Sequence, residues 1–512
     1  MRAPNISRVR EAILTIDVGT TTCKSFLFTT DGLILSAVTK EHPTYYPQLG
    51  WAEQDPSDWW NSIKRITRQV LSVARKRDIS ILAVSLTGQM HSAVPVSVSG
   101  EPLYNCITLA DRRSVSQCRE IERRISRGEL HAITGNRLDP YITAPKLLWI
   151  KEERPELFKR MHKFLPPKDF IRLKLTDQSV VDHMEASGTL LYDIRKRQWH
   201  SELFDIFQVP MDSAPALMES TDLAGEVTKT ASRDTSIEKG TPVIVGAADD
   251  VDILGTGSTD VGAARCHLGS TGGVAACIDR PISDSLTRIE CYPHVVKGLW
   301  LVGGSTSAAG TSLRWFRDNF AEDAIREGKK TGDSAYKILD SKAERSAPGS
   351  IIFLPYILGE RCPVWDAEAK GAFFGIKASH TKVDIYRSIL EGVAFSLRDI
   401  LATIEELGVG IEQLRIANGG ADSSLWRQII ADVTGKPLYF TGVEESASFG
   451  SMILGAVYLQ IYSSIEQACQ RLVKPRRVHQ PNLELSRKYT ALFRTYRKIY
   501  QSLSPEFDSI GS

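Results

Sequence analysis

The 512-residue sequence predicts an α/β protein with two domains. Three observations lead to this class. The segment "ILTIDVGTTTCKSFLFTTDGL" (13–33) has the pattern of two strands joined by a glycine and threonine turn, and "ILAVSLTG" (81–88) that of a buried strand after a helical stretch. The segment "ARCHLGSTGGVAACID" (264–279) repeats the strand, the turn and the strand. Two halves that begin with the same unit indicate two domains, with a boundary near residues 250–262.

The first half is expected to open with three strands, at 12–16, 24–29 and 33–38. Asp31 and Gly32 stand between the second and third of them, and Asp-Gly between such runs is a strong hairpin signal. The three strands should therefore form an antiparallel meander.

A helix is expected next, because Asp55 can serve as its N-cap and Pro56 as its first residue. Apolar residues then recur at helical spacing, at Trp59, Ile63, Ile66, Val70 and Val73. The continuous apolar strand "ILAVSLTG" follows, as expected of a strand buried on both faces of a parallel or mixed sheet.

The second half continues after its strand pair with alternating helices and strands. A long helix is expected over about 383–407, followed by the strand "LRIANGG" and the helix "SSLWRQIIADVTG". A short strand "KPLYFT" and a helix that begins near Glu445 complete the pattern. This alternation is typical of an α/β domain.

Composition and charge exclude several classes of function. With 42% hydrophobic and 24% charged residues the chain has the make-up of a soluble globular protein. A formal charge of +2 gives no field that would recruit nucleic acid or a membrane surface, so small molecules are the expected partners. The eight cysteines have no metal-binding or disulfide spacing, and no secretory signal precedes Ile13, so reduced thiols and a cytoplasmic location are expected.

The turn after the first strand suggests phosphate binding. Short turns rich in Gly, Ser and Thr expose amide and hydroxyl donors, although such a turn alone is as often a plain hairpin. Asp17 stands directly before this turn, and a carboxylate beside phosphate is repelled unless a divalent cation lies between them. Asp17 is therefore a candidate for holding Mg²⁺ through water, and the second turn at 269–271 is a candidate for further phosphate contacts.

The segment "TPVIVGAADDVDILG" places Asp249 and Asp250 directly after an apolar strand, where a helix is expected to open. One interpretation is helix capping by acids at the positive helix end. The other makes one aspartate the general base that accepts a proton from an alcohol during phosphoryl transfer. Further along, Gly419 and Gly420 form a strand-to-helix turn whose missing Cβ atoms would let a ligand approach the backbone.

With these motifs in this order, the chain resembles the FGGY family of carbohydrate kinases over essentially its full length, nearest to its xylulokinase branch. The resemblance is carried by "IDVGTTTCK", "GWAEQDPSDWW", "GQMHS" and the signature "GAFFGIKASHTKVDIYRSILE" (371–391). It implies the two-domain actin-like fold of sugar kinases, actin and heat-shock ATPases, with ribonuclease H-like domains over 1–255 and 256–512 and an interdomain cleft. The implied activity is transfer of the γ-phosphate of ATP, with Mg²⁺, to a sugar hydroxyl, most simply from D-xylulose to D-xylulose 5-phosphate.

The resemblance also assigns roles to single residues. Asp249 matches the catalytic base and Asp17 the acid near Mg²⁺. The sugar-side positions are Gln89, Met90, His91, Asp111 and Asp250. The nucleotide and phosphate positions are Gly19, Thr20, Thr21, Thr22, Lys24, Gly269, Ser270, Thr271, Ser307, Gly310, Gly419, Gly420 and Ala421, within which Ser307 and Gly310 belong to a further stretch with Thr306 and Ala308. His91 would hydrogen-bond a sugar hydroxyl as a neutral imidazole.

Several departures from the family pattern lie near the implied sugar pocket. Asp250 stands where Asn is common, Ala248 where Gly is common, Leu109 where Trp is common, and Ser92 follows the histidine in place of Gly. Another ketose or a polyol therefore stays open as the substrate. An actin-like or chaperone-like ATPase and a weakly active regulatory homologue are alternatives from other classes, and a homodimer is open because the sequence does not fix the oligomeric state.

Overall fold

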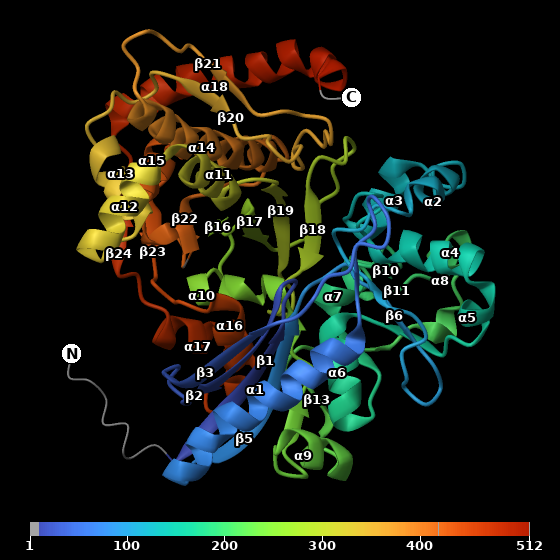
Figure 1. Cartoon of the computed structure of the whole chain (residues 1–512). Helices are drawn as coiled ribbons and strands as arrows, with labels where there is room; N and C mark the ends of the chain where they lie inside the picture. The colour runs from blue at the N-terminus through green and yellow to red at the C-terminus, as the bar shows by residue number, and fades with distance from the viewer. Residues whose placement is uncertain (1–9, 418, 511–512) are drawn as a thin grey trace.

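Two mixed sheets with the same strand order form the framework of the chain. The computed structural model describes residues 10–417 and 419–510. The first sheet runs β13(Leu223–Glu226), β14(Pro242–Ile244), β5(Ser80–Gly88), β1(Glu11–Val18), β2(Thr22–Phe28), β3(Ile34–Glu41), and β15(Ala247–Ala248) pairs with the end of β5. The second runs β18(Glu290–Pro293), β19(Trp300–Thr306), β17(Gly272–Ile278), β16(Ala263–Leu268), β22(Gln413–Ile416), β23(Leu438–Phe440), β24(Arg477–His479). Figure 1 shows the second sheet, olive to orange, above the blue strands of the first.

The two sheets repeat one pairing scheme. In the first, β1 pairs antiparallel with β2 and parallel with β5. In the second, β16 pairs antiparallel with β17 and parallel with β22. The predicted α/β class is confirmed, and the weak repeat in the sequence corresponds to a repeated topology.

Strand β1 shows how period-two burial builds two cores. Leu14, Ile16 and Val18 belong to one core with helix α1(Pro56–Arg77), whereas Ile13 belongs to another with α16(Ser446–Tyr458). Helix α16 comes from the second half of the sequence and yet packs against β1 and β5. The boundary near residue 255 stays a prediction, but the halves of the chain are joined by this helix.

Helix α1 begins as its sequence requires. Asp55 is the N-cap and accepts a hydrogen bond from the Ser57 amide, and Pro56 opens the helix. The buried side chains include Trp59, Ile63 and Val70, which form the predicted apolar stripe.

Helices of the second half pack against the second sheet, α14(Lys382–Glu406) on β17 and β19 and α15(Ser424–Thr434) on β23. Helix α14 corresponds to the helix predicted over about 383–407, and α15 to the helix predicted after it. Further helices of this half are α11(Gly310–Phe320), α12(Glu322–Thr331), α13(Ala335–Ala343) and α18(Leu483–Leu503), while α17(Ile465–Leu472) packs against α16.

A helical unit with its own apolar core lies within the first half, a subdivision that the two-domain prediction did not include. Its core runs from Ala93 to Ala214 and is separate from the cores beside the first sheet. The helices are α2(Val115–Ile121), α3(Arg127–Thr134), α4(Thr143–Glu153), α5(Pro155–Lys159) and α8(Ser201–Ile206), drawn in teal at the right of Figure 1. Of the remaining helices of this half, α6(Pro167–Thr176) packs against β5 of the first sheet, α7(His183–Ser187) contacts β15 and β18, and α9(Lys229–Thr235) packs against α1 and α6.

The acids Asp249 and Asp250 open a helical turn, as predicted, but a tight one. The 3₁₀ turn η3(Asp249–Asp252) leads into α10(Ile253–Thr256). All eight cysteines are buried and free, which confirms the expectation of unpaired thiols.

Candidate active site

The turn between β1 and β2 has its carbonyl groups fixed by the protein. His42 Nε2 lies 3.0 Å from the Gly19 oxygen, Gln54 Nε2 donates to the Thr20 oxygen at 2.7 Å, and the His42 amide donates to the Thr21 oxygen at 3.2 Å. Within the described part of the chain, no acceptor lies in hydrogen-bonding range of the Thr20 and Thr21 amides, and both threonines are exposed. The turn can therefore offer donors to an anion.

The second turn has the same form but a different support. The Gly269 amide donates to the Thr271 oxygen at 2.8 Å, as the Gly19 amide does to Thr22 at 3.0 Å. The Gly269 oxygen accepts from the Gly310 amide at 3.0 Å, and the Ser270 oxygen accepts from the amides of Ala309 and Thr311. The start of helix α11 thus holds this turn mainly through backbone groups, and the Thr311 hydroxyl adds a hydrogen bond to the Ser270 oxygen at 3.0 Å.

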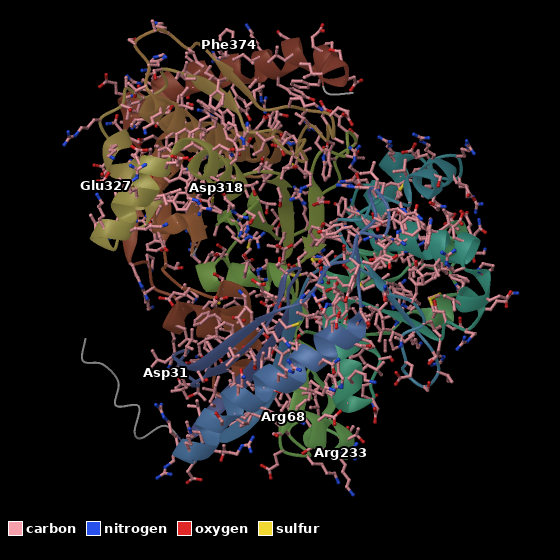
Figure 2. All side chains as sticks on the ribbon, viewed as in Figure 1. Asp31, Arg68, Arg233, Asp318, Glu327 and Phe374 are labelled. Atoms are coloured by element: carbon pink, nitrogen blue, oxygen red, sulfur yellow. The ribbon has the colours of Figure 1, made fainter. Side chains whose placement is uncertain are left out.

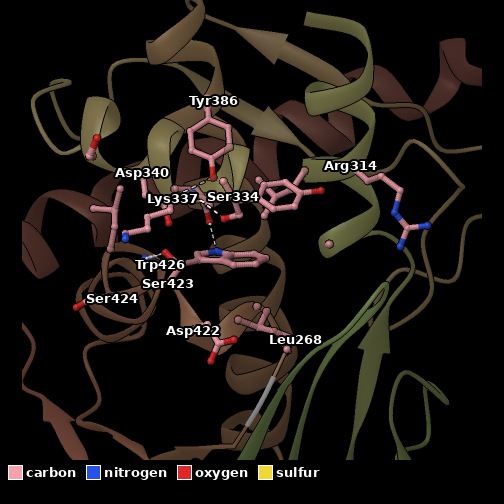
Figure 3. Close-up of a pocket in the computed structure, with 18 of the residues that line it drawn as sticks. Leu268, Arg314, Ser334, Lys337, Asp340, Tyr386, Asp422, Ser423, Ser424 and Trp426 are labelled. Atoms are coloured by element: carbon pink, nitrogen blue, oxygen red, sulfur yellow. Dashed lines mark hydrogen bonds between the residues drawn. The ribbon is translucent and has the colours of Figure 1, made fainter. Parts of the chain in front are cut away.

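A cavity of about 760 Å³ opens beside the second turn. Its lining includes five predicted nucleotide positions: Gly269, Ser270, Gly310, Gly419 and Gly420. Figure 3 shows the side chains around it, with Tyr386 and Trp426 among them. A cavity of this size with an apolar floor and a few polar groups suits a nucleoside.

The structure adds a second reason for the two glycines at 419 and 420, beside the predicted approach of a ligand. A Cβ atom on Gly420 would lie 2.5 Å from the Trp426 ring, and one on Gly419, which has φ +69°, would meet the Leu268 carbonyl. The missing side chains are needed by the protein's own packing. Asn418, which precedes them, lies outside the described residues.

Helix α13 supplies site residues that the sequence analysis missed. Ser334 before the helix and Lys337 and Asp340 within it line the cavity, and Asp340 accepts a hydrogen bond from the Tyr386 hydroxyl at 2.8 Å. The helix has an amphipathic pattern that any surface helix shows, so no local signal marked its polar face as a cavity wall.

The predicted stretch at 306–310 is held by Glu360. Its carboxylate accepts hydrogen bonds from the Thr306 hydroxyl at 2.6 Å and from the Ser307 amide at 2.8 Å. A Cβ atom on Gly310 would lie 2.5 Å from the Gly269 oxygen. Burial raises the pKa of Glu360 to about 7, although these donors act against the shift. Glu360 was not predicted, since a lone Glu in a loop carries no signal.

Asp17 lies at the end of β1 on the face that packs toward α16. Burial raises the pKa of Asp17 to about 6, with Lys24 opposing the shift and Glu445 adding to it. Lys24 forms an ion pair of 2.8 Å with Glu445, the residue that precedes α16. The predicted phosphate ligand Lys24 is thus engaged with a carboxylate in this structure.

Asp249 and Asp250 differ sharply in their surroundings. Asp250 forms an ion pair with Arg265 at 2.8 Å, and Arg265 also contacts Asp252. Desolvation acts to raise the pKa of Asp250, but Arg265 outweighs it and the pKa falls. Asp249 forms no such pair among the described residues.

Asp249 also stays exposed to solvent. Desolvation, then Asp250 and Asp17, raise the pKa of Asp249 well above its usual value. Because the exposed side chain keeps contact with water, desolvation is weakened, and the negative charges of Asp250 and Asp17 hold the pKa up. Asp249 therefore has the character of a proton acceptor, and Asp250 that of a fixed anion.

His91 occupies an unusual backbone position at the end of "GQMH". Its φ is +59°, and its Nδ1 lies 3.0 Å from the Gly188 oxygen, which makes Nδ1 the donor. Burial lowers the pKa of His91 to about 4, so the ring is neutral and Nε2 is left as an acceptor. The ring packs edge-on against Tyr141 at 5.0 Å between centroids.

The other sugar-side candidates are more deeply enclosed. Gln89 is fully buried and donates to the Gln54 oxygen at 2.9 Å, and Met90 is buried in a core. Asp111 is fully buried, accepting from the Ala52 amide at 2.6 Å and forming an ion pair of 2.7 Å with Arg113. These contacts favour structural support for Asp111, whose role toward a sugar stays a prediction.

Lys146 supports the loop that carries His91 and was not singled out in the sequence. Its ammonium group is fully buried and donates to the carbonyls of His91, Thr108 and Tyr141 at 2.6, 2.8 and 2.6 Å. Burial lowers the pKa of Lys146 to about 7.

No cluster of three or more His, Cys, Asp or Glu side chains suited to a metal ion occurs among the residues described. Over the same residues, the longest and most apolar helices fall short of what crossing a membrane requires.

Comparisons with known proteins cover nearly the whole chain. The model described as "FGGY family of carbohydrate kinases, N-terminal domain" matches residues 12–254, and the corresponding C-terminal domain model matches residues 255–459. A gluconokinase of Bacillus licheniformis is 29% identical over 98% of this chain and 98% of its own length. A xylulose kinase of Staphylococcus epidermidis is 30% identical over 96% of this chain and 97% of its own length. The ligand-bound structure of a xylulose kinase from Lactobacillus acidophilus superposes with a TM-score of 0.90 at 27% identity, covering 98% of this chain and 100% of that one.

Proposed function

The chain belongs to the FGGY family of carbohydrate kinases, which transfer a phosphoryl group from ATP with the help of Mg²⁺, and we propose that its acceptor is a neutral ketose, D-xylulose first. The observation that supports a neutral acceptor is the charge around Asp249. Its neighbours include Asp17, Asp250 and Asp252. Arg265 forms ion pairs with the last two of these acids. Such surroundings accept hydroxyl protons and repel an anionic sugar.

In the proposed reaction Asp249 accepts the proton of the sugar hydroxyl as its oxygen attacks the γ-phosphate. The raised pKa of Asp249 makes it a stronger base than a free carboxylate, while Asp250 stays ionised beside Arg265. The amides of the first turn contact phosphate oxygens, and the cavity beside the second turn holds the nucleoside. His91 orients the sugar by accepting a hydroxyl hydrogen bond on Nε2.

The residues present fit a magnesium ion. Asp17 ends its strand directly before a turn whose amides face outward, so it can bind the cation through water next to phosphate. A bound Mg²⁺ would offset the charge of the phosphates.

A second acceptor class, a sugar acid such as gluconate, is favoured by Arg361. Within the described chain Arg361 has no carboxylate in ion-pair range. Its positive charge nevertheless acts to lower the pKa values of His91, Tyr141 and Glu290, on the side of the proposed sugar site. An unpaired guanidinium there could bind a substrate carboxylate.

An ADP-release assay with D-xylulose, D-ribulose, glycerol and D-gluconate would decide between these acceptors. We expect the highest kcat/KM with a ketose, and no more than background release without sugar. If gluconate were best and Arg361→Gln abolished that preference, the sugar-acid assignment would replace ours. ADP release independent of every sugar would favour the ATPase alternative.

The domain boundary at residue 255, the interdomain cleft, the homodimer and the cytoplasmic location stay predictions. Solution scattering with and without ATP analogue and sugar would test the cleft, since closure of two domains compacts the particle.

A further inference from the structure

A second polar cavity lies on the first half, outside the proposed active site. It has a volume of about 600 Å³ and is lined by the end of β3, by one side of α1 and by Asp234 of α9. Figure 2 labels Arg68 on α1, which lines the cavity, and Arg233 on α9, the residue before Asp234. None of the residues assigned above to phosphate transfer lines it.

Unpaired cations dominate the chemistry of this cavity. Lys40 comes from β3, while Lys64, Arg65 and Arg68 recur along one side of α1. In the described structure none of these four has a carboxylate within ion-pair distance, and Arg68 donates only to the Arg233 carbonyl at 3.2 Å. A free guanidinium group can donate two parallel hydrogen bonds to two phosphate oxygens, so the cavity is suited to a phosphomonoester.

Acceptors for hydroxyl groups stand among these cations. Glu41, Asp58, Asp234 and Asn61 line the same cavity. Three carboxylates would weaken the binding of a bare anion, whereas they add hydrogen bonds for an anion that also carries hydroxyls. The combination indicates a phosphorylated sugar rather than inorganic phosphate.

His42 links this cavity to the first phosphate turn. It lines the cavity and is 7% exposed. Its ring bonds the Gly19 oxygen and its amide donates to the Thr21 oxygen, so one residue fixes two of the three turn carbonyls. The ring also packs edge-on against Trp59 of α1, with centroids 6.3 Å apart.

We propose that this cavity binds a phosphorylated sugar and that its occupancy favours ATP binding by ordering the first phosphate turn through His42. A ligand that bridges β3 and α1 fixes the segment 40–43 and thereby the turn that His42 holds. A turn ordered in advance loses less conformational entropy when ATP binds. The effect on ATP rests on the proposed kinase activity, whereas the binding of the sugar phosphate does not.

Calorimetry on the full-length protein at constant ionic strength tests the binding. The probe is D-glucose 6-phosphate, which is not the product of the proposed reaction, with inorganic phosphate and D-glucose as comparison ligands. We expect the probe to bind more tightly than either. The double variant Arg65→Ala/Arg68→Ala should lose at least about tenfold in affinity, the loss of two charge-assisted contacts.

The matched control is Arg75→Ala/Lys76→Ala, which removes two charges from the last turn of the same helix outside the cavity. Its affinity should match that of the unmodified protein. Equal affinity in all three proteins, or tighter binding of inorganic phosphate, would overturn the site.

Steady-state kinetics test the coupling. Saturating probe should lower the KM for ATP about threefold or more in the unmodified protein and leave it unchanged in Arg65→Ala/Arg68→Ala. The variant His42→Asn should still bind the probe in calorimetry but lose the kinetic response. A probe that binds without changing the KM, or a response retained in His42→Asn, would overturn the link through His42.

Discussion

The two halves repeat one sheet order and one strand, turn and strand unit, but they hold the turn differently. Side chains of His42 and Gln54 fix two carbonyls of the first turn. Backbone amides of 309–311 fix the second, with one added hydrogen bond from the Thr311 hydroxyl. The first half also supplies the acids Asp17 and Asp249, whereas the second supplies the large cavity. One framework thus carries an acidic side whose turn is held largely by side chains and a cavity side whose turn is held largely by backbone amides, and substitutions should affect the two sides unequally.

The largest effect is expected from Asp249→Asn, because only the first half supplies a base. The amide keeps the shape but cannot accept a proton, so kcat should fall by about 10²–10⁴ while ATP still binds. Turnover in the ADP-release assay and ATP affinity by calorimetry measure the two quantities. Asp205→Asn, an exposed acid on α8, is the control. An unchanged kcat would remove Asp249 from the reaction.

Gly310→Val should damage the second turn more than any side-chain loss nearby. The added Cβ would lie 2.5 Å from the Gly269 oxygen and push the start of α11 away from the turn. We expect kcat/KM for ATP to fall about a hundredfold, as when a preorganised donor set is lost. Gly128→Val is the control, since a Cβ there has no atom within 4 Å. Equal activity of the two variants would contradict the backbone support.

Gln54→Ala should weaken the first turn through a side chain alone. It removes the donor to the Thr20 oxygen, together with the hydrogen bonds of Gln54 to Thr44, Trp59 and Gln89. Loss of the bond to the turn carbonyl corresponds to about a five- to tenfold rise in the KM for ATP. The control is Gln69→Ala, which changes an exposed side chain on α1 and should leave the KM for ATP unchanged. A KM for Gln54→Ala within twofold of the unmodified protein would refute side-chain support.

Asp250→Asn should shift the pH profile of kcat. Asp250 raises the pKa of Asp249, and its removal also frees Arg265, which lowers that pKa. Both changes lower the pKa of Asp249, so activity should persist to lower pH than in the unmodified protein. A shift of the acidic limb toward higher pH would contradict this arrangement, and an abolished turnover with active Asp249→Asn would exchange the two roles.

Ser270→Ala should have the smallest effect. It removes the 3.2 Å hydrogen bond from Arg314 but leaves the backbone bonds to the Ser270 oxygen. The KM for ATP should change by less than about threefold. A tenfold rise would show that the second turn also depends on side chains, and the contrast between the halves would disappear.

Local patterns predicted most of the framework. Asp55 and Pro56 marked the start of α1, and the strands around both turns lie where their apolar runs indicated. The family motifs also placed five nucleotide candidates that line one cavity. The close approach of a ligand to Gly419 and Gly420 stays a prediction, and a sequence does not show that Trp426 and Leu268 also lie against them.

By itself the sequence determined the elements, the two turns and the pair of acids after a strand, because periodicity, caps and turn residues act over a few neighbouring positions. Only the tertiary structure decided what supports and charges them. Arg265 pairs with Asp250 and so gives Asp250 and Asp249 different pKa values. Residues of α13 line the cavity, and His42 fixes a turn that lies about 20 residues earlier in the chain. Such contacts depend on how distant segments pack, and no spacing along the chain encodes which polar face will meet which carbonyl.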